Sequence, residues 1–597
     1  MCGIFGYVGK KTNAPKLVLQ GLKLLEYRGY DSWGIGAKPI SKLEIRNSKF
    51  IIEKHVGKIG DVTLNSQLST LSSELSIGHT RWATHGGVTD INAHPHLDCT
   101  KSIAVVHNGI VENFQELKDD LIKKGHRFVS DTDTEVIPHL IEEFLKRRGF
   151  ASSVRDAFNK LKGLNAIVVA NAKSSEIIAA KNGSPLVIGV SKDGLYVSSD
   201  ATGIVKHTRK VIFLEDNQMA ILGQKIKLII LPNGSEIRPK VSNLTWKFED
   251  AEKGKFKHFF LKEIYEQPKV LEGIATNSSQ IKKISDLVRN AFGTFFIACG
   301  SASYSALAGT YLFSKIAKKH VNFAIGSEFN YLEDYIEKGT LVIPISQSGE
   351  SVDVIEPVTR AKKKGAKIIG IVNVLGSTLY RISDYKILLN AGPEKAVVAT
   401  KSLTAMIATM MLIAYSLVNK LREGRTLILK SSRNVGEILK DEYVGKIKKI
   451  ARKLKDHEHI YVIGRGLSYA TALEATLKIK EATYIHAEGF AAGELKHGVI
   501  ALIDKKTPCM VFAPNDETYD EIISNAQEVK ARGGYIIGIG PRNNEVFEEF
   551  LSTGDLGEAT MISQIVVAQL LAYFLALERG VEDPDKPRNL AKSVTVK

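Results

Sequence analysis

The sequence is poor in cysteine and lacks an amino-terminal export signal. Its four cysteines among 597 residues, Cys2, Cys99, Cys299 and Cys509, are too few and too scattered for a disulfide scaffold, and none has the paired spacing of metal ligands. The segment MCGIFGYVGK at the start has no basic residues before its apolar stretch, which excludes a signal peptide. These absences predict a protein of a reducing compartment, the cytoplasm.

Uninterrupted hydrophobic runs of membrane-spanning length are also missing. Two stretches, 402–419 and 559–577, contain no charged residue and approach the length of a spanning helix. Polar residues interrupt both stretches: Thr404, Thr409, Ser416, Ser563 and Gln564. We therefore expect two buried helices in a core or a subunit interface, and no membrane partner.

Positive charge exceeds negative charge but is not concentrated. Lys and Arg number 81 against 65 Asp and Glu, a net charge of +16, which would suit nucleic acid or phosphorylated small molecules. The densest basic stretch, 446–455, alternates with apolar residues at helical spacing, so it predicts the solvated face of an amphipathic helix. We expect no nucleic-acid partner.

The pattern of elements changes near residue 235. Before it, β-branched runs at 164–172, 175–190 and 194–200 are separated by Asn-Gly or Asp-Gly turns, which predicts antiparallel sheet. Residues 235–257 are polar and without periodicity, which is typical of a linker. With about 150 residues per domain, a chain of this length predicts two to four domains.

Beyond the linker, strand, loop and helix alternate as in parallel α/β domains, and the pattern occurs twice. Residues 295–313 and 341–374 each read as a strand, a turn and a helix, and 460–479 and 508–540 repeat them about 165 residues later. The sequence therefore predicts a duplicated domain.

The two copies differ in one loop. The first has Ser-Gln-Ser-Gly-Glu-Ser at 346–351, between a strand and a helix, whereas the second has Ala-Pro-Asn-Asp-Glu at 513–517. Hydroxyls and backbone N–H groups at a helix N-terminus favour an anion, so we predict an anion site in the first copy. Simple capping of the helix is the alternative.

Cys2 follows the initiator methionine, so removal of Met1 would leave a cysteine as the first residue. Its free α-amine would then be a base beside its own thiol, as in N-terminal nucleophile enzymes. Three later motifs supply partners for amide hydrolysis. Arg81 can grip an α-carboxylate and Asp133 an α-ammonium, while Asn108 and the N–H of Gly109 can form an oxyanion hole. Surface ion pairs and a hairpin turn are the alternatives.

The sequence closely resembles the family of isomerising glutamine–fructose-6-phosphate aminotransferases over nearly its whole length. The motifs that carry the resemblance are MCGIFGYVG, LEYRGYDS, GHTRWATHG, HNGIVENF, SDTDTEVI, KEIYEQP, SQSGES, KIKEATYIHAEGFAAGELKHG and DKPRNLAKSVTVK. Family members release ammonia from glutamine, pass it through an internal channel and use it to convert fructose 6-phosphate into glucosamine 6-phosphate. The resemblance implies the same reaction here, as the first step of amino-sugar synthesis, without metal or organic cofactor.

The resemblance also implies the domain order. We expect an α+β class II glutamine amidotransferase domain at 1–237, a linker and connecting helix at 238–284, two α/β sugar isomerase (SIS) domains with parallel sheets at 285–425 and 450–583, and an active-site tail at 584–597.

Site residues follow from the matching motifs. In the glutaminase half, Cys2 would be the nucleophile, Arg81, Thr84, His85 and Asp133 would bind glutamine, and Trp82 would gate the ammonia channel. In the isomerase half, the residues matched to sugar-phosphate binding are Ser301, Ser346, Gln347, Ser348, Ser351, Val397 and Ala591.

Four further residues match catalytic positions of the isomerase half. Glu481 matches the base that moves a proton between C1 and C2, and Lys478 a further active-site lysine. Lys592 matches the lysine that forms a Schiff base with the open-chain ketose. His497 matches a ring-opening histidine that the family takes from the neighbouring subunit, so the resemblance implies a homodimer.

Three positions depart from the common family pattern. Ala302 and Ala399 stand where a hydroxyl residue is usual, which bears on sugar affinity, and Trp33 stands where a small residue is common, which bears on channel gating. Two other functions remain open. One is a SIS-type transferase or deaminase for another phosphosugar, and the other is a non-catalytic sugar-phosphate sensor.

Overall fold

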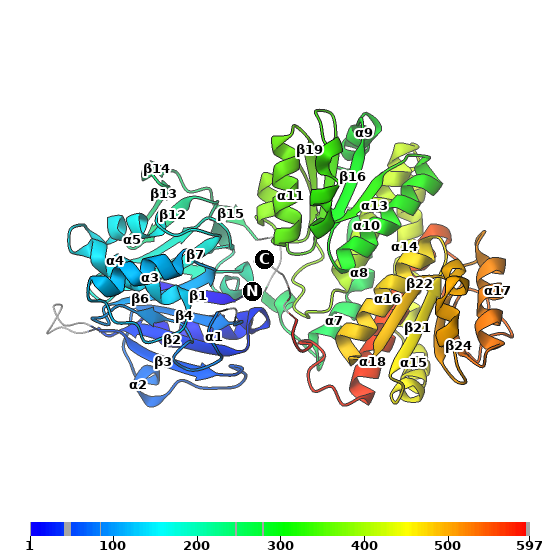
Figure 1. Cartoon of the computed structure of the whole chain (residues 1–597), viewed down its shortest axis with the longest axis horizontal. Coiled ribbons are helices and arrows are strands. Elements are labelled where there is room, and N and C mark those ends of the chain that lie inside the picture. The colour runs from blue at the N-terminus through cyan, green and yellow to red at the C-terminus, as the bar shows by residue number, and fades with distance from the viewer. Residues whose placement is uncertain are drawn as a thin grey trace. The chain divides into compact units, whose positions relative to one another are not determined.

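The computed structural model describes residues 2–40, 49–83, 85–244, 248–276, 280–590 and 592. Contacts divide the chain into two compact units, one running to Glu252 and the other comprising Lys253–Leu590. Figure 1 shows the first unit in blue to teal and the second in green to red.

The first unit contains two antiparallel sheets, as the alternating runs predict. Its larger sheet contains, from edge to edge, β15 (Ser242–Asn243), β11 (Lys210–Phe213), β9 (Val187–Val190), β10 (Gly194–Ser198), β1 (Gly3–Gly9), β4 (Leu75–Arg81), β2 (Ser32–Lys38) and β3 (Ile51–Val56). The second sheet contains β14 (Ser235–Ile237), β13 (Ile226–Ile230), β12 (Gln218–Leu222), β8 (Ile177–Lys181), β7 (Asn165–Asn171), β6 (Ile103–Gly109) and β5 (His96–Leu97).

The two sheets stack face to face, and helices cover their outer faces (Figure 1). Between the sheets lies a core of Ile4, Ile77, Val106 and Val168 with their neighbours. The helices of this unit are α1 (Ala14–Leu25), α2 (Ser66–Ser69), α3 (Phe114–Lys123), α4 (Val136–Leu145), α5 (Phe150–Phe158) and α6 (Ala201–Ile204). Helix α1 packs on the larger sheet, and α4 and α5 pack on the second one.

Two local features differ from what the sequence pattern suggests. The Asn-Gly turn at 182–183 does not connect neighbouring strands of one sheet, because β8 belongs to the second sheet and β9 to the first, so this turn carries the chain from one sheet to the other. Strand β15 lies inside the stretch read as a linker, yet its backbone pairs with β11. A two-residue edge strand leaves too little pattern in the sequence to be recognised.

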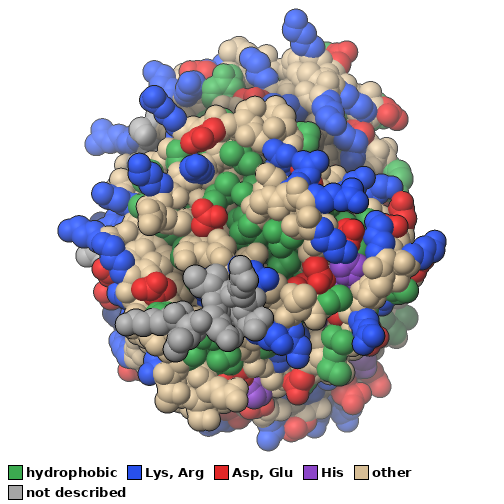
Figure 2. Space-filling view, turned by 90° about the vertical axis from the view of Figure 1, so that its left-hand side faces the viewer, with side chains coloured by type: hydrophobic (Ala, Val, Ile, Leu, Met, Phe, Trp, Pro, Cys, Tyr) green, Lys and Arg blue, Asp and Glu red, His purple; other side chains and the backbone are tan. Residues whose placement is uncertain are grey.

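On the surface of the first unit, charges of both signs are mixed. Figure 2 shows lysine and arginine side chains interspersed with acidic and uncharged ones over the side that this unit forms.

The second unit contains two parallel five-stranded sheets of identical strand order. The first has the order β17 (Asn322–Ile325), β16 (Thr294–Ala298), β18 (Leu341–Ser346), β19 (Lys367–Val372) and β20 (Tyr385–Leu388). The second has the order β22 (His486–Ala491), β21 (His459–Gly464), β23 (Pro508–Phe512), β24 (Tyr535–Gly540) and β25 (Glu549–Ser552). The predicted duplication is therefore confirmed at the level of topology.

Helices surround both sheets of the second unit (Figure 1). They are α7 (Phe259–Tyr265), α8 (Gln267–Thr276), α9 (Ile281–Arg289), α10 (Ser301–Leu312), α11 (Val352–Lys363), α12 (Thr378–Ile382), α13 (Lys401–Leu417), α14 (Leu421–Ile438), α15 (Asp441–Leu454), α16 (Leu467–Thr483), α17 (Tyr519–Lys530) and α18 (Thr560–Glu578). Residues from both halves, from Phe260 to Ala576, form one continuous apolar cluster.

The two uncharged stretches are core helices, as predicted. Helix α13 is buried along nearly its whole length. Within the described residues, one segment, Gly557–Glu578, is long and apolar enough to cross a membrane, and 94% of its most apolar window is buried in the protein. The basic stretch at 446–455 is confirmed as the exposed face of α15, which buries Val444, Ile447 and Ile450 on the other side.

Candidate active sites

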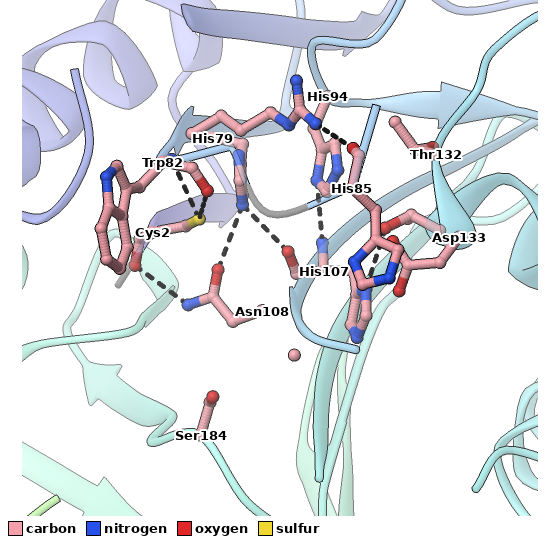
Figure 3. A pocket seen from close by; sticks show the side chains of 13 residues that line it. Cys2, His79, Trp82, His85, His94, His107, Asn108, Thr132, Asp133 and Ser184 are labelled. Atoms are coloured by element: carbon pink, nitrogen blue, oxygen red, sulfur yellow. Dashed lines mark hydrogen bonds between the residues drawn. The ribbon is translucent and has the colours of Figure 1, made fainter. Parts of the chain in front are cut away.

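Cys2 lies at the start of β1, beside the end of β4. Strand pairing of Gly3 with Thr80 brings the two strand ends together, and the backbone N–H of Trp82 donates to the Cys2 Sγ atom at 3.2 Å. Figure 3 shows the thiol at the edge of a pocket that Trp82, His79 and Asn108 also line. The sheet therefore places a thiol in a concave site.

Hydrogen bonds fix the backbone of Cys2 beside the predicted oxyanion donors. The Cys2 carbonyl accepts from Asn108 Nδ2 at 3.0 Å and from Arg28 Nε at 3.3 Å. The Asn108 Oδ1 atom pairs with His79 Nε2 at 3.1 Å, which orients the amide so that its NH₂ group points toward Cys2. Gly109 lines the same pocket with φ of +140°, a conformation that favours glycine.

The two predicted substrate-binding charges both line this pocket, but each has protein partners. Arg81 donates to the carbonyl oxygens of His85, Gly86 and Gly87, at 3.1 and 3.0 Å for the last two. Asp133 is buried, and its Oδ2 atom accepts from the Val111 N–H at 2.7 Å. Arg81 thus fixes the 85–87 loop beside the pocket. Asp133 is held in place by the backbone N–H of Val111, two residues after the end of β6.

The pocket is small. Its volume is about 40 Å³, which is room for a few water molecules. His85 and Trp82 line it, while Thr84 lies outside the described residues.

Four buried histidines beside the thiol were not predicted as site residues. His79 stacks on His94 with ring centroids 4.1 Å apart, and His94 packs edge-on against His96. His107 pairs through Nδ1 with Thr134 Oγ1 at 2.9 Å. Burial lowers the pKa of each ring below its usual value, to about 3 for His79, so these imidazoles are neutral near pH 7. The motif GHTRWATHG contains His79, but only the fold assembles the group.

Trp33, the departure that bears on channel gating, does not line this pocket. Its side chain is 1% exposed in the cluster between α1 and the larger sheet, and its ring lies 4.7 Å from that of His55.

The second site lies where the strand order of the first parallel sheet reverses. Strands β17 and β18 flank β16 on opposite sides, and the carboxyl ends of β16 and β18 at such a reversal are the usual ligand position in parallel sheets. Ser301 begins α10 after β16, and the 346–351 loop follows β18. The topology therefore brings together two segments predicted from separate motifs.

The serine loop is built as a tight turn before α11. Gly349 has φ of +65°, and a Cβ atom there would lie 2.2 Å from Ser377 Oγ, so only glycine fits. The Ser346 and Ser348 hydroxyls accept the N–H groups of Gly349 and Glu350 at 3.0 and 3.1 Å. Two N–H groups expected to be available to an anion therefore have partners within the loop.

The second copy differs in the equivalent place. There Asp516 Oδ1 accepts from the Thr518 N–H at 2.9 Å, so a carboxylate occupies the turn before α17. A carboxylate repels an anionic ligand, which agrees with an anion site in the first copy alone.

A buried ion-pair cluster joins the two halves of the second unit at the start of α10, after the carboxyl end of β16. Lys478 Nζ lies 2.6 Å from Glu481 Oε2 and 3.3 Å from Glu474 Oε1, and donates to Ser301 Oγ at 2.9 Å. Ser301 Oγ also donates to Glu474 at 3.2 Å. The structure thus brings the predicted residues Ser301, Lys478 and Glu481 into contact across α10 and α16.

Charges in this cluster are set by burial and by one another. Burial acts to lower the pKa of Lys478, but Glu474 and Glu481 outweigh it and raise the pKa above its ordinary value, so Lys478 is a cation. Burial raises the pKa of Glu474 to about 7. Glu474 was not predicted, although its position four residues before Lys478 on the same helix face is a usable signal.

The other predicted residues of this half differ in their burial. His497 is exposed at the end of a short helix, Ala492–His497. Val397 is buried and its N–H donates to the Asp585 carbonyl at 2.9 Å. Lys592 is half-buried, and Ala591 lies outside the described residues. Of the two departures in the isomerase half, Ala302 packs against the apolar cluster and Ala399 is half-buried.

The fold and these sites together define a glutamine amidotransferase joined to a pair of sugar isomerase domains. The chain matches the family described as "Glutamine amidotransferase domain" at residues 79–206 and the family described as "SIS domain" at 288–416 and 453–551.

Several relatives match over their full length. The chain is 42% identical to a glutamine–fructose-6-phosphate aminotransferase (isomerizing) of Thermococcus kodakarensis and 40% identical to one of Thermus thermophilus, covering 100% of both chains in each case. Among solved structures, the C-terminal domain of glucosamine-fructose-6-phosphate aminotransferase from Francisella tularensis is 32% identical with a TM-score of 0.51, over 55% of this chain and 98% of that one. The chain therefore belongs to the glutamine–fructose-6-phosphate aminotransferase (isomerizing) family.

Proposed function

We propose that the protein converts glutamine and fructose 6-phosphate into glutamate and glucosamine 6-phosphate. The observation that carries the proposal is that one chain of this family holds both a thiol pocket with oxyanion donors and a lysine–carboxylate cluster at the reversal point of a parallel sheet. The first site would release ammonia and the second would consume it.

In the glutaminase half, the Cys2 thiolate would attack the side-chain amide of glutamine after removal of Met1. The α-amine of Cys2 takes the thiol proton and passes it to the leaving ammonia, and water then hydrolyses the thioester to glutamate. Asn108 Nδ2, together with the Gly109 N–H, stabilises the oxyanion. Arg81 would exchange the carbonyls of the 85–87 loop for the substrate carboxylate, while Asp133 holds the ammonium. Thr84 and His85 complete the glutamine site, with Trp82 as the gate for ammonia.

In the isomerase half, ammonia would replace the C2 carbonyl oxygen of the open-chain ketose, with loss of water. Glu481 then moves a proton from C1 to C2, which converts the C2 imine into an amine and C1 into an aldehyde. Lys478, as a buried cation, favours the negative charge that develops on the sugar. Ser346, Gln347, Ser348 and Ser351 would hold the phosphate at the start of α11.

Two catalytic groups would come from segments outside this cluster. Lys592 would form a Schiff base at C2, releasing the carbonyl oxygen as water, and ammonia would then displace the lysine amine to give the C2 imine. This role needs a neutral amine and so cannot belong to the charged Lys478. His497, which is exposed, would open the sugar ring in the site of a neighbouring subunit, so we propose a homodimer. The free thiols of all four cysteines are compatible with the proposed cytoplasmic location.

The test is a paired assay of glutamate and amino-sugar formation from glutamine and fructose 6-phosphate. Cys2→Ala should abolish glutamate release and glutamine-dependent synthesis while retaining fructose 6-phosphate binding. Cys509→Ala, which removes the buried thiol of β23, serves as the matched control and should retain both products.

Outcomes separate the alternatives. Amino-sugar formation only from another phosphosugar would replace the proposed substrate. Binding of fructose 6-phosphate without either product, in protein whose Met1 has been removed, would identify a sensor and overturn the proposal.

A further inference from the structure

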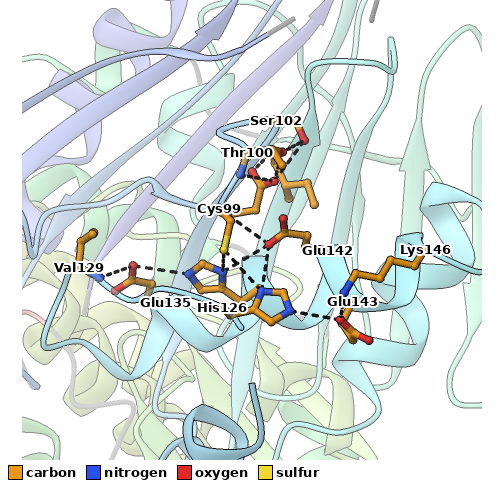
Figure 4. A network of polar contacts seen from close by, with 12 residues as sticks. Cys99, Thr100, Ser102, His126, Val129, Glu135, Glu142, Glu143 and Lys146 are labelled. Carbon is orange, nitrogen blue, oxygen red and sulfur yellow. Dashed lines mark hydrogen bonds and ion pairs between the residues drawn. The ribbon is translucent and has the colours of Figure 1, made fainter. Parts of the chain in front are cut away.

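Four side chains on the second sheet's outer side converge at one point away from the thiol pocket. Cys99 lies between β5 and β6, His126 follows α3, and His139 and Glu142 lie on α4. One ligand atom from each, Sγ, Nδ1, Nδ1 and Oε2, lies within 4.8 Å of the others. Figure 4 shows Cys99, His126 and Glu142 directed toward one another.

The spacing of these atoms matches the edges of a tetrahedral metal site. Cys99 Sγ lies 3.6 Å from His126 Nδ1 and 3.4 Å from His139 Nδ1. Glu142 Oε2 lies 3.1 and 3.5 Å from the same two nitrogens. Zinc bonds of about 2.0–2.1 Å to nitrogen or oxygen and about 2.3 Å to sulfur give tetrahedral edges of about 3.3–3.6 Å. A zinc ion would therefore fit with only small side-chain shifts.

Carboxylates also stand behind both histidines. The outer ring nitrogen of His126, Nε2, lies 3.2 Å from Glu143 Oε2, and that of His139 faces Glu135 Oε1 at 3.7 Å. A carboxylate on the far nitrogen fixes the tautomer and orientation of a metal-binding imidazole. Because both rings present Nδ1 inward and Nε2 to a carboxylate, the cluster has the two-layer arrangement of a metal site.

Charge balance favours a divalent ion. A Cys99 thiolate and the Glu142 carboxylate contribute two negative charges, and two neutral imidazoles contribute none, so a divalent cation gives a neutral site. Mixed sulfur, nitrogen and oxygen donors suit zinc, whereas magnesium and calcium prefer oxygen ligands. Four protein ligands leave no open position, which is typical of structural sites.

We propose that Cys99, His126, His139 and Glu142 bind one structural zinc ion. The proposal departs from the expectation of no metal, which rested on the absence of paired spacing along the chain. The ligands come instead from three separate segments.

The ion would connect the 98–102 turn and the segment after α3 to α4. Glu135, behind His139, also accepts from the Ser130 N–H at 2.7 Å and lies two residues after Asp133. Zinc would thus stabilise the turn that carries Asp133, which is proposed to bind the ammonium group of glutamine.

The experiment uses the full-length chain, purified without an affinity tag under reducing conditions. Protein stripped with a chelator is reloaded with zinc, desalted and assayed for bound metal by mass spectrometry. The same stripped protein is titrated with cobalt(II), whose thiolate charge-transfer and ligand-field bands report a cysteine ligand and tetrahedral geometry. We expect about one ion per chain and a tetrahedral, thiolate-bound spectrum.

Two variants test the ligands without touching the thiol pocket. Cys99→Ala alters an exposed residue and should remove the charge-transfer band and the retained zinc. Glu143→Gln, behind His126, should weaken zinc binding about 10–100-fold in competition with a chromophoric chelator. The matched controls, Cys509→Ala and Glu116→Gln on α3, should behave as the wild type.

Each contrary result overturns the proposal. If wild-type protein retained no zinc after desalting, or if the cobalt spectrum lacked a thiolate band, the cluster would be a hydrogen-bond network and not a metal site. Equal zinc retention by wild type and Cys99→Ala would place the ion elsewhere. These readouts do not depend on enzyme activity, so they are independent of the proposed function.

Discussion

Acid should destabilise the amino-terminal unit through its buried histidines. His79, His94, His96 and His107 are nearly inaccessible to solvent, and burial lowers the pKa of each. The charged groups around them are Arg81 and Lys54, which lower the histidine pKa values further, and Asp133 and Glu135, which act in the opposite direction. The folded unit therefore holds these imidazoles neutral at a pH where an unfolded chain would protonate them.

The sign and size of the effect follow from linkage. A base with a lowered folded pKa contributes stability that is present above its unfolded pKa, about 6.5, and is lost as pH falls below it. Below about pH 6.5 each such histidine costs up to about 1.4 kcal/mol per pH unit, so four cost up to about 5 kcal/mol by about pH 5.5. A whole domain has only about 5–15 kcal/mol of stability.

One other histidine of the unit acts in the same direction. Burial lowers the pKa of His207 to about 4, which adds to the loss on acidification. The group of four therefore makes the larger contribution to the slope.

Tryptophan fluorescence can measure this unit selectively, because all three tryptophans, at 33, 82 and 246, precede the unit boundary at Glu252. Urea unfolding followed at several pH values should give a free energy of unfolding that falls steeply below about pH 6.5. A free energy that is flat across this range would refute the reasoning.

One substitution isolates a single histidine. His94→Asn removes the ring stacked on His79, and should reduce the loss between about pH 7.5 and about pH 5.5 by about a quarter. His486→Asn, at an exposed position of the second unit, is the control and should leave the slope unchanged. Equal slopes for wild type and His94→Asn would contradict the assignment.

Three further predictions concern named contacts. Asn108→Ala should lower kcat for glutamine hydrolysis about 10²–10³-fold, measured as glutamate release, while fructose 6-phosphate binding persists. Glu474→Gln should remove an inflection near pH 7 from the rate of amino-sugar formation with external ammonia, because burial raises the pKa of that carboxyl to about 7; an unchanged profile would count against this origin. Asp585→Ala leaves two buried N–H groups at the start of α7 without an acceptor. It should lower the free energy of unfolding of the second unit by about 2–3 kcal/mol in circular dichroism, relative to the exposed control Glu582→Ala.

Elements with a strong repeating pattern could be predicted from the sequence. The duplicated strand–turn–helix segments and the charge-free helices α13 and α18 follow from periodicity and composition, because each element carries its own signal. The crossing between β8 and β9 could not be predicted, because a turn looks alike whether it joins strands of one sheet or of two.

The sites divide in the same way. The 346–351 loop could be predicted from its turn residues, since a strand before it and a helix after it give the position, whereas Ser301 follows from the family resemblance. The histidine group around His79 and the cluster around Cys99 could not, because their members come from separate segments and meet only when the second sheet and its helices pack. Single histidines in a sequence carry no sign of such partners.

The apolar cluster that runs from Phe260 to Ala576 has a consequence for how the duplicated half can be handled. Each copy has an apolar cluster of its own, but the two also share this larger one, because α14 packs against both α13 and α18. Cutting the chain between Ile438 and Asp441 and separating the fragments would expose the shared apolar surface on both, which would favour their aggregation. A protease that cuts near Lys253 should instead release both copies together as one stable folded fragment. Each copy therefore depends on the other for part of its stability.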